Sequence, residues 1–216
     1  MSMRRLSLVL AGATAAVLIA MVAVSIATGA TQEAHEHFHP YPEYATALIA
    51  RPGGLRALMG LDVAFLCLYT GFFAAFATYL RQRGQPFTYL ALGAMVATAL
   101  LDIVEDHHIL SLLAMAESGR PIAESTIAFQ ETLSSTKFSV SYLALFLFGL
   151  AIPRTSKLGW ALALFLTAGT LASATLGYAA PPAWRESLDS GRWIGFLAGF
   201  AIAGAWLVRE PESSTT

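Results

Sequence analysis

Residues 87–113 read F-T-Y-L-A-L-G-A-M-V-A-T-A-L-L-D-I-V-E-D-H-H-I-L-S-L-L, an apolar run with a short ionisable stretch inside it. A helix needs about 20 apolar residues to cross the hydrocarbon core of a bilayer, and this run is long enough. A charge at the centre of such a helix costs about 2.5–3.5 kcal/mol. The ionisable side chains of residues 102–108 therefore need protein, water or an ion around them. The run predicts both a membrane span and a site.

Five further stretches of the chain are long and apolar in the same way. The 216 residues are 56% hydrophobic and 12% charged, whereas a soluble domain carries about 25% charged residues. The sequence predicts an all-α integral membrane protein, a six-helix transmembrane bundle with short loops, in which residues 1–216 form a single domain in the lipid bilayer. The expected spans are about 6–28, 55–80, 87–113, 133–152, 158–178 and 193–208. The net charge of −1 argues against a nucleic-acid partner.

The distribution of Lys and Arg predicts the orientation of the bundle. The connections on the side of the N-terminus hold more of these residues than the opposite ones, and basic residues are enriched on the cytoplasmic side. We therefore expect cytoplasmic N- and C-termini in a multi-pass protein of a bacterial-type plasma (inner) membrane. Residues 28–30 also resemble a signal-peptide cleavage site, but the apolar run before them is long for a signal peptide and favours a retained helix.

Depth and helical phase predict which ionisable side chains meet. Asp102 lies about 15 residues into a span that begins on the inner side, or about 23 Å at 1.5 Å per residue, which places it in the outer third of the membrane. Asp62 and Lys137 lie near the starts of spans that begin on the outer side. The three residues are therefore expected at one depth. At 100° per residue, Asp102, Glu105 and Asp106 share one helix face, His108 lies near the Glu105 side, and His107 points sideways. The predicted polar pocket comprises Asp62, Tyr69, Asp102, Glu105, Asp106, His108, Lys137 and Ser141.

The charge balance of this pocket suggests a function. Four carboxylates surround one ammonium, and a proton, a bound cation or a protonated His108 would offset the excess negative charge. We expect a periplasm-facing pocket that binds or moves a proton, a cation or a small cationic solute. The competing interpretation is a buried ion network that only holds the helices together. No phosphate loop, nucleophile elbow or H-E-x-x-H motif is present. Binding is therefore favoured over catalysis, and the catalytic residues of an enzyme stay unknown, apart from Glu105 as a candidate general base.

Three alternating histidines, His35, His37 and His39, lie in the first connection on the outer side. In an extended strand they would share one face and would suit Zn²⁺ or Cu²⁺. They define an alternative function, a metal-dependent membrane enzyme acting on a lipid-type substrate. A structural or pH-responsive loop is the other interpretation. In either case we expect the loop to lie above the acidic pocket.

Small residues repeat at four-residue spacing in the last span, at Gly191, Gly195, Gly199 and Ala203. Such a stripe lets helix backbones approach closely within a membrane. It predicts close packing inside the bundle, or else a homodimer or membrane-complex interface. The latter would fit a third function, an accessory or assembly subunit of a membrane complex.

Overall fold

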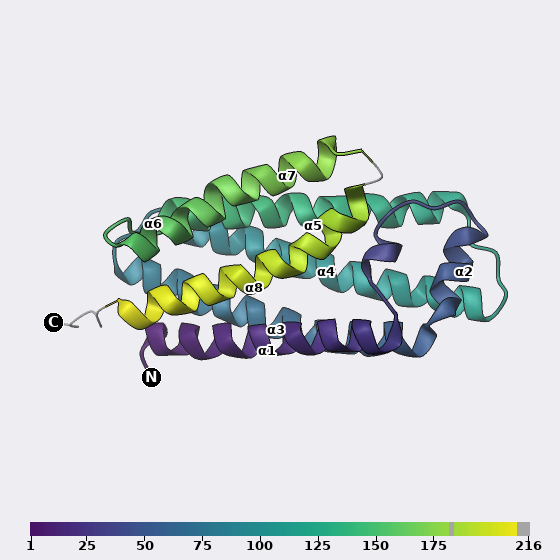
Figure 1. Cartoon of the computed structure of the whole chain (residues 1–216), viewed down its shortest axis with the longest axis horizontal. Helices are drawn as coiled ribbons and strands as arrows, with labels where there is room; N and C mark the ends of the chain where they lie inside the picture. The colour runs from purple at the N-terminus through teal and green to yellow at the C-terminus, as the bar shows by residue number, and fades with distance from the viewer. Residues whose placement is uncertain (182–183, 211–216) are drawn as a thin grey trace.

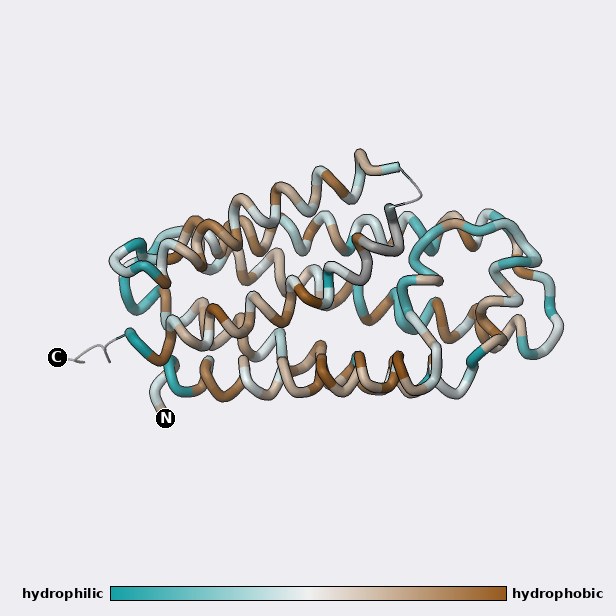
Figure 2. Tube along the Cα trace, viewed as in Figure 1, coloured by the Kyte–Doolittle hydropathy of each residue, from teal (hydrophilic) through white to brown (hydrophobic). Residues whose placement is uncertain are grey.

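The computed structural model describes residues 1–181 and 184–210, and this part of the chain contains helices and no strand. Six helical segments are long and apolar enough to cross a membrane. They are α1 (Met3–Thr28), α3 (Pro52–Gln82), α4 (Thr88–Glu117), α5 (Glu124–Ala151), the interrupted helix α6 (Lys157–Leu164)–η2 (Phe165–Gly169)–α7 (Thr170–Ala179), and α8 (Arg185–Arg209). Figure 1 shows them side by side along the long axis, and Figure 2 shows hydrophilic residues gathered at the two ends. The predicted all-helical fold is confirmed for the described residues, which contain six helices long and apolar enough to span a membrane.

The start of α1 and the end of α8 lie at the same end of the bundle (Figure 1). Arg4 Nη1 donates a hydrogen bond to the carbonyl of Glu210 across these two helices. This contact agrees with an even number of spans. Residues 211–216 lie outside the described residues.

The connection between α1 and α3 is not a short loop, and the expectation of short loops is wrong there. Residues 29–51 contain a 3₁₀ turn, η1 (Glu33–His35), and a further helix, α2 (Glu43–Ala50). Tyr44 and Leu48 of α2 are fully buried in an apolar cluster with Ile109, Leu112 and Leu113 of α4. Because this burial anchors the connection, residues 29–51 form a cap over the end of the bundle opposite the termini (Figure 1).

The core has two main apolar layers with polar residues between them, and a small third cluster of Met21, Ala30 and Leu58. The larger layer lies toward the termini and is built on aromatic rings, with Phe73 and Phe148 4.9 Å apart and Phe76 and Trp206 5.9 Å apart. The smaller layer lies under the cap. On α3, Asp62 falls between Met59 of the smaller layer and Leu66 of the larger one. The ionisable residues are therefore enclosed by apolar packing above and below.

Close packing uses small residues at two places. A Cβ on Gly149 of α5 would lie 2.7 Å from Thr167 Cγ2, so only glycine allows α5 to approach η2 this closely. On α8, Gly199 packs against Phe165 and Ala203 is 5% exposed, as expected for internal packing. A Cβ on Gly191 or Gly195 would meet nothing within 4 Å. The predicted stripe on α8 is thus internal only over its second half.

Candidate functional site

The buried polar layer is centred on Lys137 of α5, which is 6% exposed. Its Nζ lies 2.9 Å from Asp102 Oδ1 and also contacts Glu105, both on α4. Glu36 of the cap approaches the same ammonium at 4.0 Å. Taking charges out of water is costly and is offset only by close opposite charges. Lys137 is therefore held by carboxylates from α4 and the cap.

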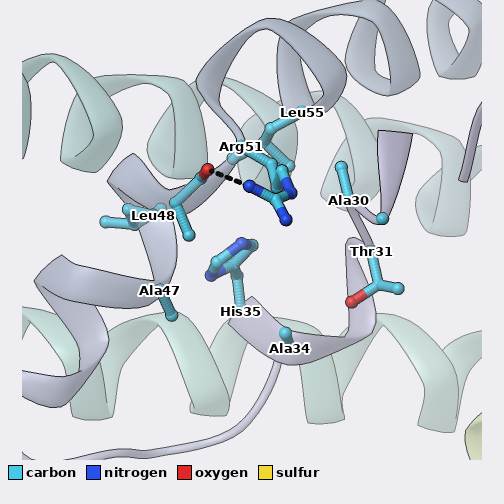
Figure 3. Close-up of a pocket in the computed structure, with 10 residues that line it drawn as sticks. Ala30, Thr31, Ala34, His35, Ala47, Leu48, Arg51 and Leu55 are labelled. Atoms are coloured by element: carbon cyan, nitrogen blue, oxygen red, sulfur yellow. Dashed lines mark hydrogen bonds between the residues drawn. The ribbon is translucent and has the colours of Figure 1, made fainter. Parts of the chain in front are cut away.

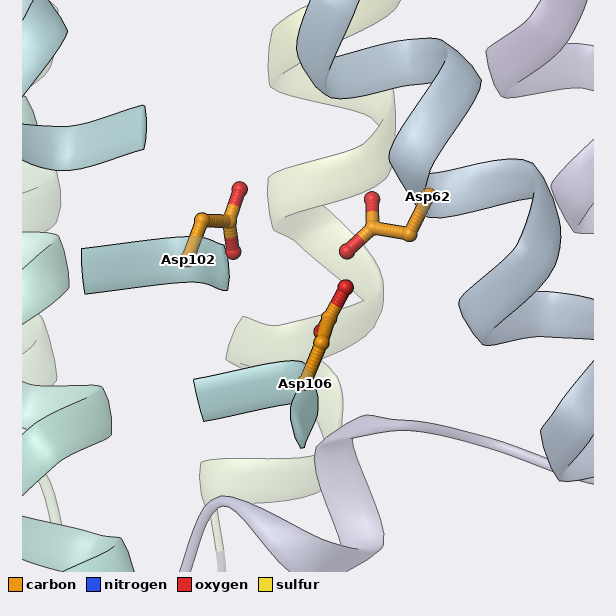
Figure 4. A group of neighbouring side chains, drawn as sticks. All are labelled: Asp62, Asp102 and Asp106. Atoms are coloured by element: carbon orange, nitrogen blue, oxygen red, sulfur yellow. The ribbon is translucent and has the colours of Figure 1, made fainter. Parts of the chain in front are cut away.

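Beside this ion pair, three aspartates from two helices converge. Asp62 of α3 and Asp102 and Asp106 of α4 are all buried, and one oxygen of each lies within 4.8 Å of the others. Figure 4 shows the carboxyl groups of the two helices turned toward one another. Among the described residues, this is the group of at least three His, Cys, Asp or Glu donors with the geometry to hold a metal ion. All of its donors are carboxylate oxygens.

Neutral side chains donate hydrogen bonds to two of these aspartates. The Tyr69 hydroxyl donates to Asp102 Oδ2 at 3.3 Å. Gln32 Nε2, from the cap, donates to Asp106 Oδ1 at 3.2 Å. Because these donors come from α3 and from the cap, the cap takes part in positioning the aspartates.

A hydrogen-bonded chain leads from Glu105 to His108. The Ser134 hydroxyl and Gln130 Nε2 both donate to Glu105 Oε1, the latter at 3.4 Å. Gln130 Oε1 lies 2.6 Å from His108 Nδ1. His107, in contrast, is exposed and its Nδ1 contacts the Ile103 carbonyl at 2.8 Å. His108 reaches the site only through Gln130, and His107 points sideways as its phase predicts.

The cap is tied to the bundle by two acidic residues, Glu33 in its 3₁₀ turn and Glu36 directly after it. Glu36 Oε2 accepts a hydrogen bond from Arg192 Nη2 of α8 at 2.7 Å. Glu33 accepts one from the Trp193 indole. Burial, and secondly the nearby Glu36, raise the pKa of the Glu33 carboxyl above its usual range. The cap therefore closes the polar layer with its own charges paired to α5 and α8.

The expectation that His35, His37 and His39 share one face of a strand is wrong. Residues 33–35 form a 3₁₀ turn, so His35 turns inward and is 4% exposed, whereas His37 and His39 are half-buried. The three imidazoles do not form a three-ligand group within the part of the chain that the structure describes. Burial, with His39 nearby as a smaller cause, lowers the pKa of His35 to about 4. The predicted Zn²⁺ or Cu²⁺ site on this loop has no geometric support.

The structure thus brings together most of the residues predicted for the pocket. Asp62, Tyr69, Asp102, Glu105, Asp106 and Lys137 meet in one layer, His108 joins through Gln130, and Ser141 is buried one turn beyond Lys137. The layer also contains five residues outside the predicted pocket, namely Gln32, Glu36, Gln130, Ser134 and Arg192. The predicted position of the cap above the acidic residues is confirmed by the Gln32 and Glu36 contacts.

The layer carries an excess of acidic groups. Its five carboxyl groups belong to Glu36, Asp62, Asp102, Glu105 and Asp106, and its cationic groups to Lys137 and Arg192.

Comparisons of the chain with protein-family models, with curated proteins and with solved structures gave no match.

Proposed function

We propose that this chain is a multi-pass plasma-membrane protein that binds a small inorganic cation, in exchange with protons, between Asp62, Asp102 and Asp106. The observation that carries the proposal is the convergence of three buried carboxylates within 4.8 Å. Five carboxyl groups share the layer with two cations, so complete ionisation would leave like charges unopposed. A network that only held helices together would need no such excess. A bound cation, or protons in its place, balances it.

The donor set favours a hard, divalent cation. Carboxylate oxygens suit Ca²⁺, Mg²⁺ and Mn²⁺ rather than Cu²⁺ or Zn²⁺, which favour nitrogen and sulfur ligands. Oxygens on opposite sides of a Ca²⁺ ion are about 4.6–5.2 Å apart, twice the Ca–O distance. A spacing within 4.8 Å therefore suits ligands around one bare ion.

Lys137 acts in this proposal as a tethered counter-charge. It shares Asp102 with the three-aspartate group, since Oδ1 of that residue faces the ammonium at 2.9 Å. The ammonium and a bound ion compete for the electrons of one carboxylate, so Lys137 limits how tightly the ion is held. A site that releases its ion is what transport or exchange requires, rather than permanent structural binding.

The cap end of the bundle is proposed to face the periplasm. Support comes from the excess of Lys and Arg in the connections at the opposite end. Fusing a reporter that is active only in the cytoplasm to the C-terminus tests this orientation. Activity is expected, and inactivity would reverse the assignment.

Binding of Mn²⁺ to the full chain tests the function. In nanodiscs of zwitterionic lipid, the electron paramagnetic resonance signal of free Mn²⁺ should reveal one saturable site that Ca²⁺ or Mg²⁺ competes for. Asp62→Asn and Asp106→Asn should each weaken binding at least tenfold. The control Glu124→Gln removes an exposed carboxylate at the start of α5 and should bind like the wild type. No saturable binding by the wild type, or Asn variants that bind Mn²⁺ as tightly as the wild type, would refute the proposal.

A further inference from the structure

A cavity lies within the cap, and neither Gln32 nor Glu36 lines it. It has a volume of about 190 Å³ and lies between the end of α1, η1, α2 and the start of α3 (Figure 3). At roughly 30 Å³ for a water molecule, this is room for a ligand of a few non-hydrogen atoms. The acidic residues of the polar layer are not among those that line it.

His35 lines this cavity, and one nitrogen of its ring has no hydrogen-bond partner. The side chain is 4% exposed, and its Nδ1 is buried without a hydrogen-bond partner. Buried polar atoms almost always have a partner, so this atom calls for one. The ring itself is held in place, since Tyr44 packs edge-on against it at 5.8 Å and donates its hydroxyl to the His35 carbonyl at 3.0 Å. A fixed ring with a free nitrogen is a preformed binding group.

Arg51 faces His35 across the cavity (Figure 3). Its guanidinium carries five N–H donors in a fixed fork, of which Nη1 donates to the Ala50 carbonyl at 3.3 Å. None of the residues that line the cavity, all of them described, is acidic. The two acidic residues of the neighbouring turn, Glu33 and Glu36, are bonded to Trp193 and Arg192 of α8 instead. The polar groups of the cavity therefore select an anion.

Most of the remaining lining is aliphatic, formed by Ala30, Ala34, Ala47, Leu48 and Leu55, and Thr31 adds one hydroxyl. A fully hydrated inorganic anion would leave this surface unused, whereas a short hydrocarbon chain would cover it. We propose that the cavity binds a small aliphatic monocarboxylate, with the carboxylate between Arg51 and His35 and the chain against Leu48 and Leu55. The cavity is distinct from the cation site, so the two proposals can fail separately.

Butyrate is the probe, and its binding to the full chain in zwitterionic nanodiscs can be followed by saturation-transfer NMR. Arg51→Gln removes the exposed guanidinium, and Ala47→Leu fills the cavity from an exposed position. Each should weaken saturable butyrate binding at least tenfold. The thermal unfolding of the helices, followed by circular dichroism, should stay unchanged. Arg56→Gln is the matched control, because Arg56 is exposed, pairs with Glu117 and does not line the cavity.

Four outcomes would overturn the inference. They are no saturable butyrate binding by the wild type, unchanged binding by Arg51→Gln, unchanged binding by Ala47→Leu, and butyramide or inorganic phosphate binding as tightly as butyrate. Asp106→Asn is expected to bind butyrate like the wild type, which separates this test from the test of the cation site.

Discussion

Replacing Lys137 with methionine removes the cation at the centre of the polar layer. Lys137 is 6% exposed. Its ammonium lies 2.9 Å from Asp102 and 4.0 Å from Glu36, and it also contacts Glu105. Removing one partner of a buried ion pair costs about 3–5 kcal/mol, because the other charge stays buried and uncompensated. We expect Lys137→Met to lower the free energy of unfolding by that amount.

The matched comparison is an exposed ion pair of the same chain. Arg56 and Glu117 lie 2.5 Å apart, but their side chains are 49% and 35% exposed. Exposed pairs contribute little to stability because water and salt screen them. Arg56→Met should therefore change the unfolding midpoint far less than Lys137→Met.

A double-mutant cycle in detergent, followed by circular dichroism, measures the coupling directly. Asp102→Asn removes one of the charges that Lys137→Met leaves unpaired, so the double variant should be more stable than the sum of the single losses predicts. For residues in contact, the coupling is about 0.5–3 kcal/mol. Additive losses, or equal effects of Lys137→Met and Arg56→Met, would refute the view that the ammonium is held by these buried carboxylates.

Three further predictions concern the cap and the helix packing. The pKa of His35 is lowered from 6.5 in the unfolded chain to about 4 in the folded protein. Between pH 6.5 and 4 the imidazole is therefore protonated in the unfolded chain but neutral in the folded protein. The free energy of unfolding should fall over this range by about 3 kcal/mol. Thermal unfolding at several pH values should show this loss for the wild type and less of it for His35→Gln. Gly149→Ala should destabilise by about 1–3 kcal/mol, because its Cβ would lie 2.7 Å from Thr167 Cγ2, whereas Gly195→Ala, in open space, should not change the melting temperature. Glu36→Gln weakens the pairing of the cap with Arg192, so limited proteolysis should cut residues 29–51 faster than in the wild type, and equal cutting would contradict this.

The spans and most of the pocket could be predicted because both depend on local periodicity. Apolar length locates the six helices, and residue number along a helix gives depth, which places Asp62 and Lys137 level with Asp102. Gln130 was missed because α5 begins at Glu124, ahead of the apolar run that starts near residue 133. A polar first turn of a helix has no membrane signal of its own.

The contacts of the cap could not be predicted from the sequence. Gln32 meets Asp106, and Glu36 meets Arg192, across separations of 74 and 156 residues, and no local pattern specifies such pairs. The three histidines were misjudged because alternation over five residues does not distinguish a strand from a loop that contains a 3₁₀ turn. Burial of Tyr44 and Leu48 of α2 folds this connection back over the bundle, so His35 enters the interior.

A crystal structure of the full chain grown with Mn²⁺, with data collected at the manganese absorption edge, tests the cation site most directly. The proposal predicts an anomalous difference peak between Asp62, Asp102 and Asp106, within about 2.0–2.6 Å of one oxygen of each, the range for hard cations. The peak should vanish in Asp106→Asn crystals grown in the same way. Clear density for the three side chains without an anomalous peak would contradict the proposal.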